Sequence, residues 1–298
     1  SSSTFDKLME QESARATVVK SQISQTPNNK NIAKVIYMGL CFCVLYTGLS
    51  ASNLVASIYD NLGYKSLGQV SSTFFYAVFS ASAIVAPKIM EGWPYKKAVF
   101  VGALGYIFPL IGSMMTALCD HEEDEPVPSH IWCTDTLYIY STNILTNMIN
   151  GVTAVILWIG VNQYITSCAN ESNQGKYLGL FYAINNVSSL TGGIMSTFVL
   201  DKYGFSYYFT VCSLLVVLAI IMISMAPEAP KYHVEESETI AQTCSKIFKL
   251  TASTRMNKFI PYMMFAGLVT ATFGGFQYKI VENTIPTYTD EEKSSVVA

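Results

Sequence analysis

Three asparagines lie inside one strongly apolar stretch, and their type and spacing suggest hydrogen-bond recognition. Asn143, Asn147 and Asn150 stand at positions i, i+4 and i+7 within residues 137–160, so a helix places them on one face. An amide inside hydrocarbon is costly unless it meets a partner or a solvated cavity. The three amides therefore either line a path for a polar solute or join helices through interhelical hydrogen bonds.

A second apolar stretch, residues 177–200, carries Asn185, Ser189 and Gly192 on one helical face. Further polar residues inside apolar runs complete the set. The candidates for lining a solute cavity are Asn53, Gln69, Asn143, Asn147, Asn150, Asn185 and Ser189. The alternative is close packing of helices on small and amide side chains, which is the favoured interpretation for Gly192.

The sequence lacks the residue patterns typical of an enzyme. It contains no phosphate-binding loop, metalloprotease motif or nucleophile–base arrangement. Residues 120–125 are acidic except for His121, and His130 follows them. Consecutive carboxylates without ligand spacing are typical of a solvated charge run. We therefore predict no enzymatic activity, no metal and no cofactor.

The composition is that of a membrane protein. Hydrophobic residues make up 51% of the chain and charged residues only 13%, whereas soluble domains carry about 25% charged residues. The net charge of −3 gives no indication of nucleic-acid binding. The bilayer is therefore the predicted partner, and the interior of the predicted spans contains no ionisable group suited to proton coupling.

Apolar runs long enough to cross a bilayer, which takes about 20 residues, recur along the chain. The predicted spans are residues 32–56, 67–87, 98–118, 137–160, 177–200, 205–226 and 259–281. They predict four regions: a polar tail (1–31), a six-span bundle (32–226), a cytosolic loop with an amphipathic helix (227–258), and a seventh span with a second half that is cut short (259–298).

Basic residues set the predicted orientation. The tail and the loops on its side of the membrane hold most of the lysines and arginines, whereas the opposite loops between spans hold only Lys65 and Lys202. Because cytoplasmic loops carry the excess of basic residues, the N-terminus is predicted to be cytosolic. Cys119 and Cys133 then flank a loop on the oxidising side, where they either form a disulfide or remain two free thiols.

Several segments form recognisable motifs: Trp158-Ile159-Gly160, Gln163-Tyr164-Ile165-Thr166, Gly175 to Tyr182, Asn61 to Gly68, and Pro261, Gly267 and Phe273-Gly274-Gly275. Together they resemble the UNC-93 family of the major facilitator superfamily. The resemblance implies an all-α polytopic membrane protein with a major-facilitator-type N-terminal six-helix bundle, plus the first helix of the second half. It also implies that spans 1, 2, 4 and 5 line the central cavity.

The inner loop between spans 2 and 3 departs from the superfamily pattern, which usually reads Asp-Arg-x-Gly-x-Arg-Arg. Glu91 stands in place of the Asp of this pattern, and Lys96 and Lys97 stand in place of its last two Arg residues. The central Arg and Gly are absent. The resemblance implies that these three residues form a latch, meaning contacts that hold the two halves of the transporter fold together in one conformational state. The absence of the central Arg argues against a complete latch.

One function is the leading prediction, and two alternatives remain open. The resemblance implies a regulatory or accessory role toward other membrane proteins, which would then be partners. The asparagines favour the alternative of a solute carrier for a neutral or weakly charged small molecule. A structural subunit of a larger membrane complex is the third.

Overall fold

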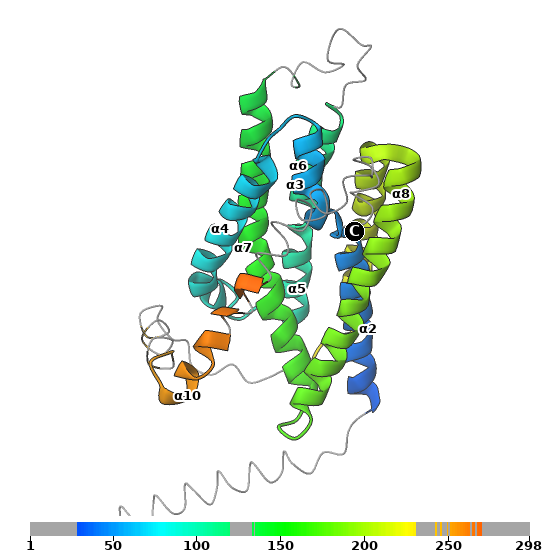
Figure 1. The fold of residues 1–298 in the computed structure, drawn as a ribbon. Helices are drawn as coiled ribbons and strands as arrows, with labels where there is room; N and C mark the ends of the chain where they lie inside the picture. The colour runs from blue at the N-terminus through cyan, green and yellow to red at the C-terminus, as the bar shows by residue number, and fades with distance from the viewer. Residues whose placement is uncertain are drawn as a thin grey trace, which may run out of the picture.

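The computed structural model describes residues 29–119, 133 and 135–230, and a set of positions between 242 and 269. All the regular elements in these residues are helices, which confirms the predicted all-α fold. Figure 1 shows them as α2 (Asn29–Gly48), α3 (Ala51–Asn61), α4 (Leu67–Ile89), α5 (Tyr95–Leu104), α6 (Ile107–Ala117), α7 (Thr136–Cys168), α8 (Gln174–Met225) and α10 (Thr254–Asn257).

Five helical segments in the described residues are long and apolar enough to cross a membrane. They are Lys30–Gly48, Leu67–Ile89, Tyr95–Ala117, Thr136–Cys168 and Lys202–Met225. The predicted span 177–200 is helical as well, because it forms the first part of α8. It is not among the five, since its amides, hydroxyls and glycines lower its hydropathy.

Three interruptions divide these long segments. The predicted first span breaks at Leu49 and Ser50 into α2 and α3, and the predicted third span breaks at Gly105 into α5 and α6. In α8 the break is Gly204, whose φ of 75° and ψ of −177° are not helical. Glycine adopts this backbone conformation without the clash that a Cβ would cause, so the chain reverses there between two helical halves.

Aspartates stabilise the starts of α7 and α4. Asp135 accepts hydrogen bonds from the backbone N–H of Leu137 (3.0 Å) and Tyr138 (3.3 Å), which begins α7. Asp60 accepts from the N–H of Ser66 (2.9 Å), and Ser66 has a φ of 64°. The carboxylate thus holds the tight turn that leads into α4.

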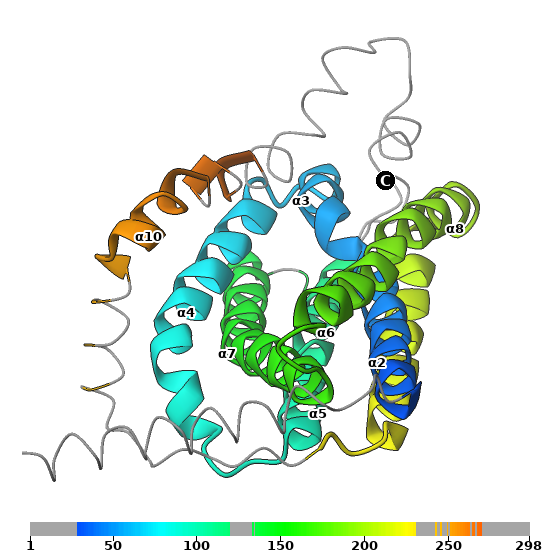
Figure 2. The same ribbon diagram turned by 90° about the horizontal axis from the view of Figure 1, so that it is seen from below.

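Small residues bring the helices close together. In the view of Figure 2, α4 lies at one edge of the bundle, and α2 with the second half of α8 lies at the opposite edge. Gly39 of α2 faces Ile184 in the first half of α8, and Gly48 faces the carbonyl oxygen of Cys212 in the second half. On the other side, Gly151 of α7 lies against the backbone of Phe75 in α4. The backbones approach closely because no Cβ separates them.

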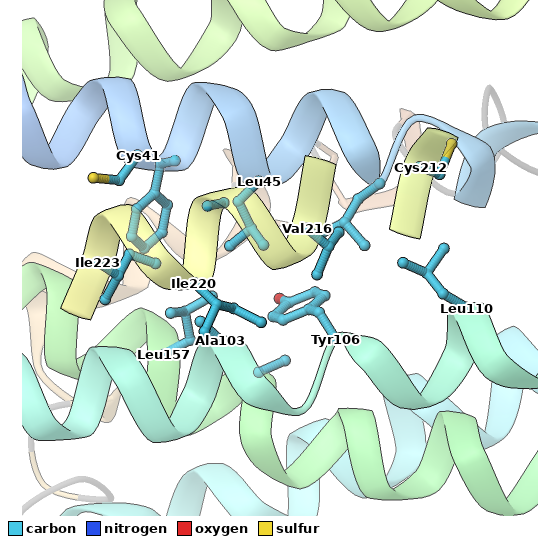
Figure 3. Close-up of a cluster of buried hydrophobic side chains, with 14 of the residues drawn as sticks. Cys41, Leu45, Ala103, Tyr106, Leu110, Leu157, Cys212, Val216, Ile220 and Ile223 are labelled. Carbon is cyan, nitrogen blue, oxygen red and sulfur yellow. The ribbon is translucent and has the colours of Figure 1, made fainter. Parts of the chain in front are cut away.

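The core lies where α2, α5, α6, α7 and the second half of α8 meet (Figure 3). Most of its side chains are apolar, and in the close-up the ring of Tyr106 lies among aliphatic side chains from these helices. The buried residues labelled there are Cys41, Leu45, Ala103, Tyr106, Leu110, Leu157, Cys212, Val216, Ile220 and Ile223.

Three side chains bind the backbone where α8 ends. Tyr37 donates to the carbonyl of Met222 (2.9 Å), Tyr164 to that of Pro227 (2.7 Å) and Lys34 to that of Glu228 (2.8 Å). The carbonyl of Met222 is one of the last four of α8 and lacks an intrahelical donor, so Tyr37 of α2 supplies one. Tyr164 and Lys34 bind residues just beyond the helix. They fix the point at which the chain leaves the bundle.

Some predicted features fall outside the described residues. These are most of the N-terminal tail, the acidic residues 120–125, the apolar residues expected to form one face of the amphipathic helix (Ile240, Cys244, Ile247 and Leu250), and residues 270–298.

Candidate functional site

Asn143 belongs to a hydrogen-bond network that joins three helices. The hydroxyl of Tyr59 in α3 donates to Asn143 Oδ1 (2.6 Å) and lies 2.9 Å from Ser113 Oγ in α6. Asn143 Nδ2 donates to Thr116 Oγ1 and to the carbonyl of Ile139, both at 2.9 Å. The side chain is only 1% exposed. Asn143 therefore holds α3, α6 and α7 together, as in the helix-joining alternative.

The other two asparagines of this row differ from Asn143 and from each other. Asn147 is half-buried, and its Nδ2 donates to the carbonyl of Asn143 (2.9 Å). Asn150 is 6% exposed, and its Oδ1 is buried without a hydrogen-bond partner among the described residues. A buried carbonyl oxygen without a donor is costly, so Asn150 is the member of the row that calls for a solute or a water.

Asn185, in the first half of α8, also has a buried side-chain oxygen without a donor in the part of the chain that the structure describes. It is 7% exposed, and its Oδ1 has no partner among the described residues. Ser189, one turn further along, is exposed, as is Gln69 on α4. Asn53 lies on α3, but its side chain is outside the described residues. Among the candidates whose side chains the structure describes, Asn150 and Asn185 are those with a side-chain oxygen that is buried and has no donor in the described part of the chain.

An aromatic cluster, defined here as Phe42, Tyr46, Trp158, Phe181 and Tyr182, joins α2, α7 and α8. The Trp158 ring centroid lies 5.9 Å from Phe42, 5.7 Å from Tyr46 and 6.3 Å from Tyr182. The ring of Phe42 also meets that of Phe181 at 5.1 Å. Phe42 and Phe181 are fully buried, whereas Tyr182 is 38% exposed. The cluster therefore has a packed back and a more open edge.

Polar groups border this cluster. The hydroxyls of Tyr46 and Tyr106 lie 3.2 Å apart, and the Tyr182 hydroxyl reaches Asn162 Oδ1 at 3.5 Å. Asn162 Nδ2 donates to the carbonyl of Trp158 (2.8 Å). The sequence interpretation missed the cluster, because aromatic residues in apolar runs usually fill cores. Two features of the sequence could have indicated the cluster. Phe42 and Tyr46 are four residues apart and so share one helix face, and Trp158 and Tyr182 both lie in the motifs that resemble the family.

The residues that join α4 to α5 make local contacts. Glu91 pairs with Lys88, with Nζ 2.5 Å from Oε2, and the ammonium of Lys97 lies 4.8 Å from the centroid of the Trp93 ring. Both partners of each pair lie within four residues of one another. Lys96 is half-buried at the start of α5.

At the opposite end of the bundle, Cys119 and Cys133 are joined by a disulfide, with their Cα atoms 5.4 Å apart. It ties the end of α6 to the start of α7 across the acidic loop. Within the described part of the chain, no three His, Cys, Asp or Glu residues gather as metal ligands would.

Comparison with known proteins identifies the family. A model of the Major Facilitator Superfamily matches residues 136–297. The UNC93-like protein MFSD11 of Xenopus tropicalis is 24% identical over 173 residues, and that of Xenopus laevis is 22% identical over the same length. Each alignment covers 57% of this chain and only 34% of the relative.

A solved structure described as a D-xylose-proton symporter has the same fold. It superimposes with a TM-score of 0.55 at 14% identity, covering 89% of this chain and 64% of that one. This likeness concerns the arrangement of helices. The similarity in fold agrees with the family match and with the motifs noted in the sequence. The chain belongs to the Major Facilitator Superfamily and is UNC-93-like.

Proposed function

We propose that the protein carries an uncharged or weakly charged small solute across the membrane. The observation that carries this proposal is the pair of buried carbonyl oxygens, on Asn150 and Asn185, that have no donor among the described residues. In a bilayer, buried polar groups are costly and mark functional paths when they face a solvated cavity. A solute with hydroxyl or N–H groups supplies the missing donors.

The charge distribution supports a neutral solute. Residues 67–87, 98–118, 136–168, 177–200 and 203–225 contain no Asp, Glu, His, Lys or Arg. An ion moved into such a region loses its hydration without gaining a charged partner. The described helices therefore suit a solute that carries no full charge.

The experiment is uptake into proteoliposomes. The purified full chain is reconstituted, and entry of labelled neutral solutes is compared between the wild type and the Asn150→Leu and Asn185→Leu variants. Losing one hydrogen bond to the solute costs about 1.4 kcal/mol, so we expect uptake at low solute concentration to fall about tenfold in each variant.

Asn186→Leu is the matched control, because Asn186 is exposed on the same helix as Asn185. Asn147→Leu is a second comparison, since its Nδ2 is already bonded within α7. Both are expected to retain uptake. Wild-type proteoliposomes that take up none of the solutes would refute the carrier function.

The second candidate is a regulatory or accessory role toward other membrane proteins, including that of a structural subunit. It is favoured by the similarity to UNC93-like proteins. Co-purification of a stoichiometric membrane protein without uptake would select this role.

We also propose that the N-terminus lies on the cytosolic side, as the basic residues indicate. An epitope tag placed before Ser1 is expected to be reached by antibody after digitonin opens the plasma membrane, and to be hidden in intact cells. Staining of intact cells, or staining only after all membranes are opened, would reverse the orientation.

A further inference from the structure

We infer that Tyr46, Trp158, Tyr182 and Asn185 form the recognition site for an uncharged, ring-shaped solute that bears O–H or N–H donors. This inference rests on the proposed carrier function and adds the chemical class of the solute. Planar aromatic heterocycles and pyranose rings share this chemistry, because both present a flat face together with donors at the edge.

The ring faces come from three helices. Tyr46 in α2, Trp158 in α7 and Tyr182 in α8 gather around the indole, with centroid distances of 5.7 Å and 6.3 Å from Trp158. The Trp158 and Tyr182 rings are nearly parallel, with an interplanar angle of 13°. Phe42 and Phe181 close the back of this group and are fully buried. Flat C–H or π surfaces pack well on such faces.

Polar atoms next to these rings can accept hydrogen bonds. Asn185 follows Phe181 and Tyr182 by one helical turn, so it lies beside them on α8. Its Oδ1 is buried and lacks a partner among the described residues. The hydrogen bond from the Tyr182 hydroxyl to Asn162 Oδ1 is 3.5 Å long, which is weak enough for a solute donor to replace it. The site thus combines aromatic faces with acceptors, which selects a solute with donors.

The same groups discriminate against ions. A cation over an aromatic ring gains about 2 kcal/mol when desolvated, whereas its burial costs several kcal/mol. The helices that contribute these residues hold no carboxylate between residues 29 and 59, 136 and 168, or 177 and 200. The balance therefore favours a neutral solute.

Tryptophan fluorescence tests the site directly. Trp158 becomes the sole reporter in a Trp93→Phe/Trp132→Phe background, because the chain has 3 tryptophans. The purified full chain is titrated with adenosine and with D-glucose, which separate the heterocycle from the pyranose. Tetraethylammonium and benzoate serve as charged comparisons. We expect a saturable change in Trp158 emission with at least one neutral probe and none with either ion.

Variants then assign the residues. Asn185→Leu and Tyr182→Leu are expected to weaken binding of that neutral probe at least tenfold. The matched controls Asn186→Leu and Tyr203→Leu alter exposed side chains on the same helix and are expected to bind normally. Because Tyr182 is partly exposed, Tyr182→Leu remains informative if Asn185→Leu fails to fold.

The outcomes separate the site from the carrier function. Uptake that persists unchanged in both Asn185→Leu and Tyr182→Leu would overturn the site and leave the carrier intact. Binding at Trp158 without uptake would support the site and overturn the carrier. A response to the ions in preference to the neutral probes, or no response to either neutral probe, would overturn the solute class proposed here.

Discussion

Gly102→Ala is expected to lower the free energy of unfolding by about 3 kcal/mol, since overpacking a close contact costs this much. A Cβ at Gly102 would lie 2.5 Å from the backbone nitrogen of Leu157 and 2.6 Å from its Cα. These are backbone atoms of α7, so no side-chain rotation can relieve the overlap. To accept the methyl group, α5 and α7 must move apart along a fully buried contact.

The measurement is thermal unfolding of the purified protein in detergent. Gly179→Ala is the matched control, because it is also in a helix and no atom lies within 4 Å of its added Cβ. Alanine is favoured over glycine in helices by up to about 1 kcal/mol, so this variant is expected to unfold at the wild-type temperature or slightly above it. Equal melting temperatures for the two variants would show that the α5–α7 contact is looser than described.

Tyr59→Phe is expected to destabilise the protein by about 2 kcal/mol, because the loss of one partner leaves a buried acceptor unsatisfied. The variant preserves the ring and removes the hydroxyl that donates to Asn143 Oδ1 at 2.6 Å. Asn143 and Ser113 are then left with fewer partners among buried side chains. Solute binding at Trp158 is expected to be unchanged, since this network is distinct from the aromatic cluster.

A double-mutant cycle checks this expectation in the same thermal assay. Asn143→Leu alone, and in combination with Tyr59→Phe, should give a double variant that is less destabilised than the sum of the single variants, because the two residues share one hydrogen bond. Tyr207→Phe, which alters an exposed tyrosine, is the control. Strict additivity in the cycle would mean that the bond between Tyr59 and Asn143 contributes nothing.

The sequence was sufficient to predict the fold class. The lack of charge across residues 67–87, 98–118 and 136–168 leaves few alternatives to membrane helices. Helix boundaries were predicted less well. The fourth helix was expected to end at Gly160 but continues to Cys168, where hydroxyls such as that of Thr166 bond back to the preceding turn. Local bonding of this kind is invisible to a hydropathy pattern.

The candidate site could be predicted only in part. Spacing placed Asn143, Asn147 and Asn150 on one face, but their environments depend on which helix lies opposite each residue. Asn143 meets Tyr59 and Thr116, whereas Asn150 Oδ1 meets no donor among the described residues. The aromatic cluster depends on the packing of three helices that are distant in sequence, and residue type alone did not distinguish it from core.

The contacts of Lys34, Tyr37 and Tyr164 with the end of α8 also bear on motion. Because carbonyls up to Glu228 are bonded to α2 and α7, residues 226–228 cannot separate from the bundle unless these three hydrogen bonds break. Removing the Tyr37 and Tyr164 hydroxyls would therefore loosen this segment first.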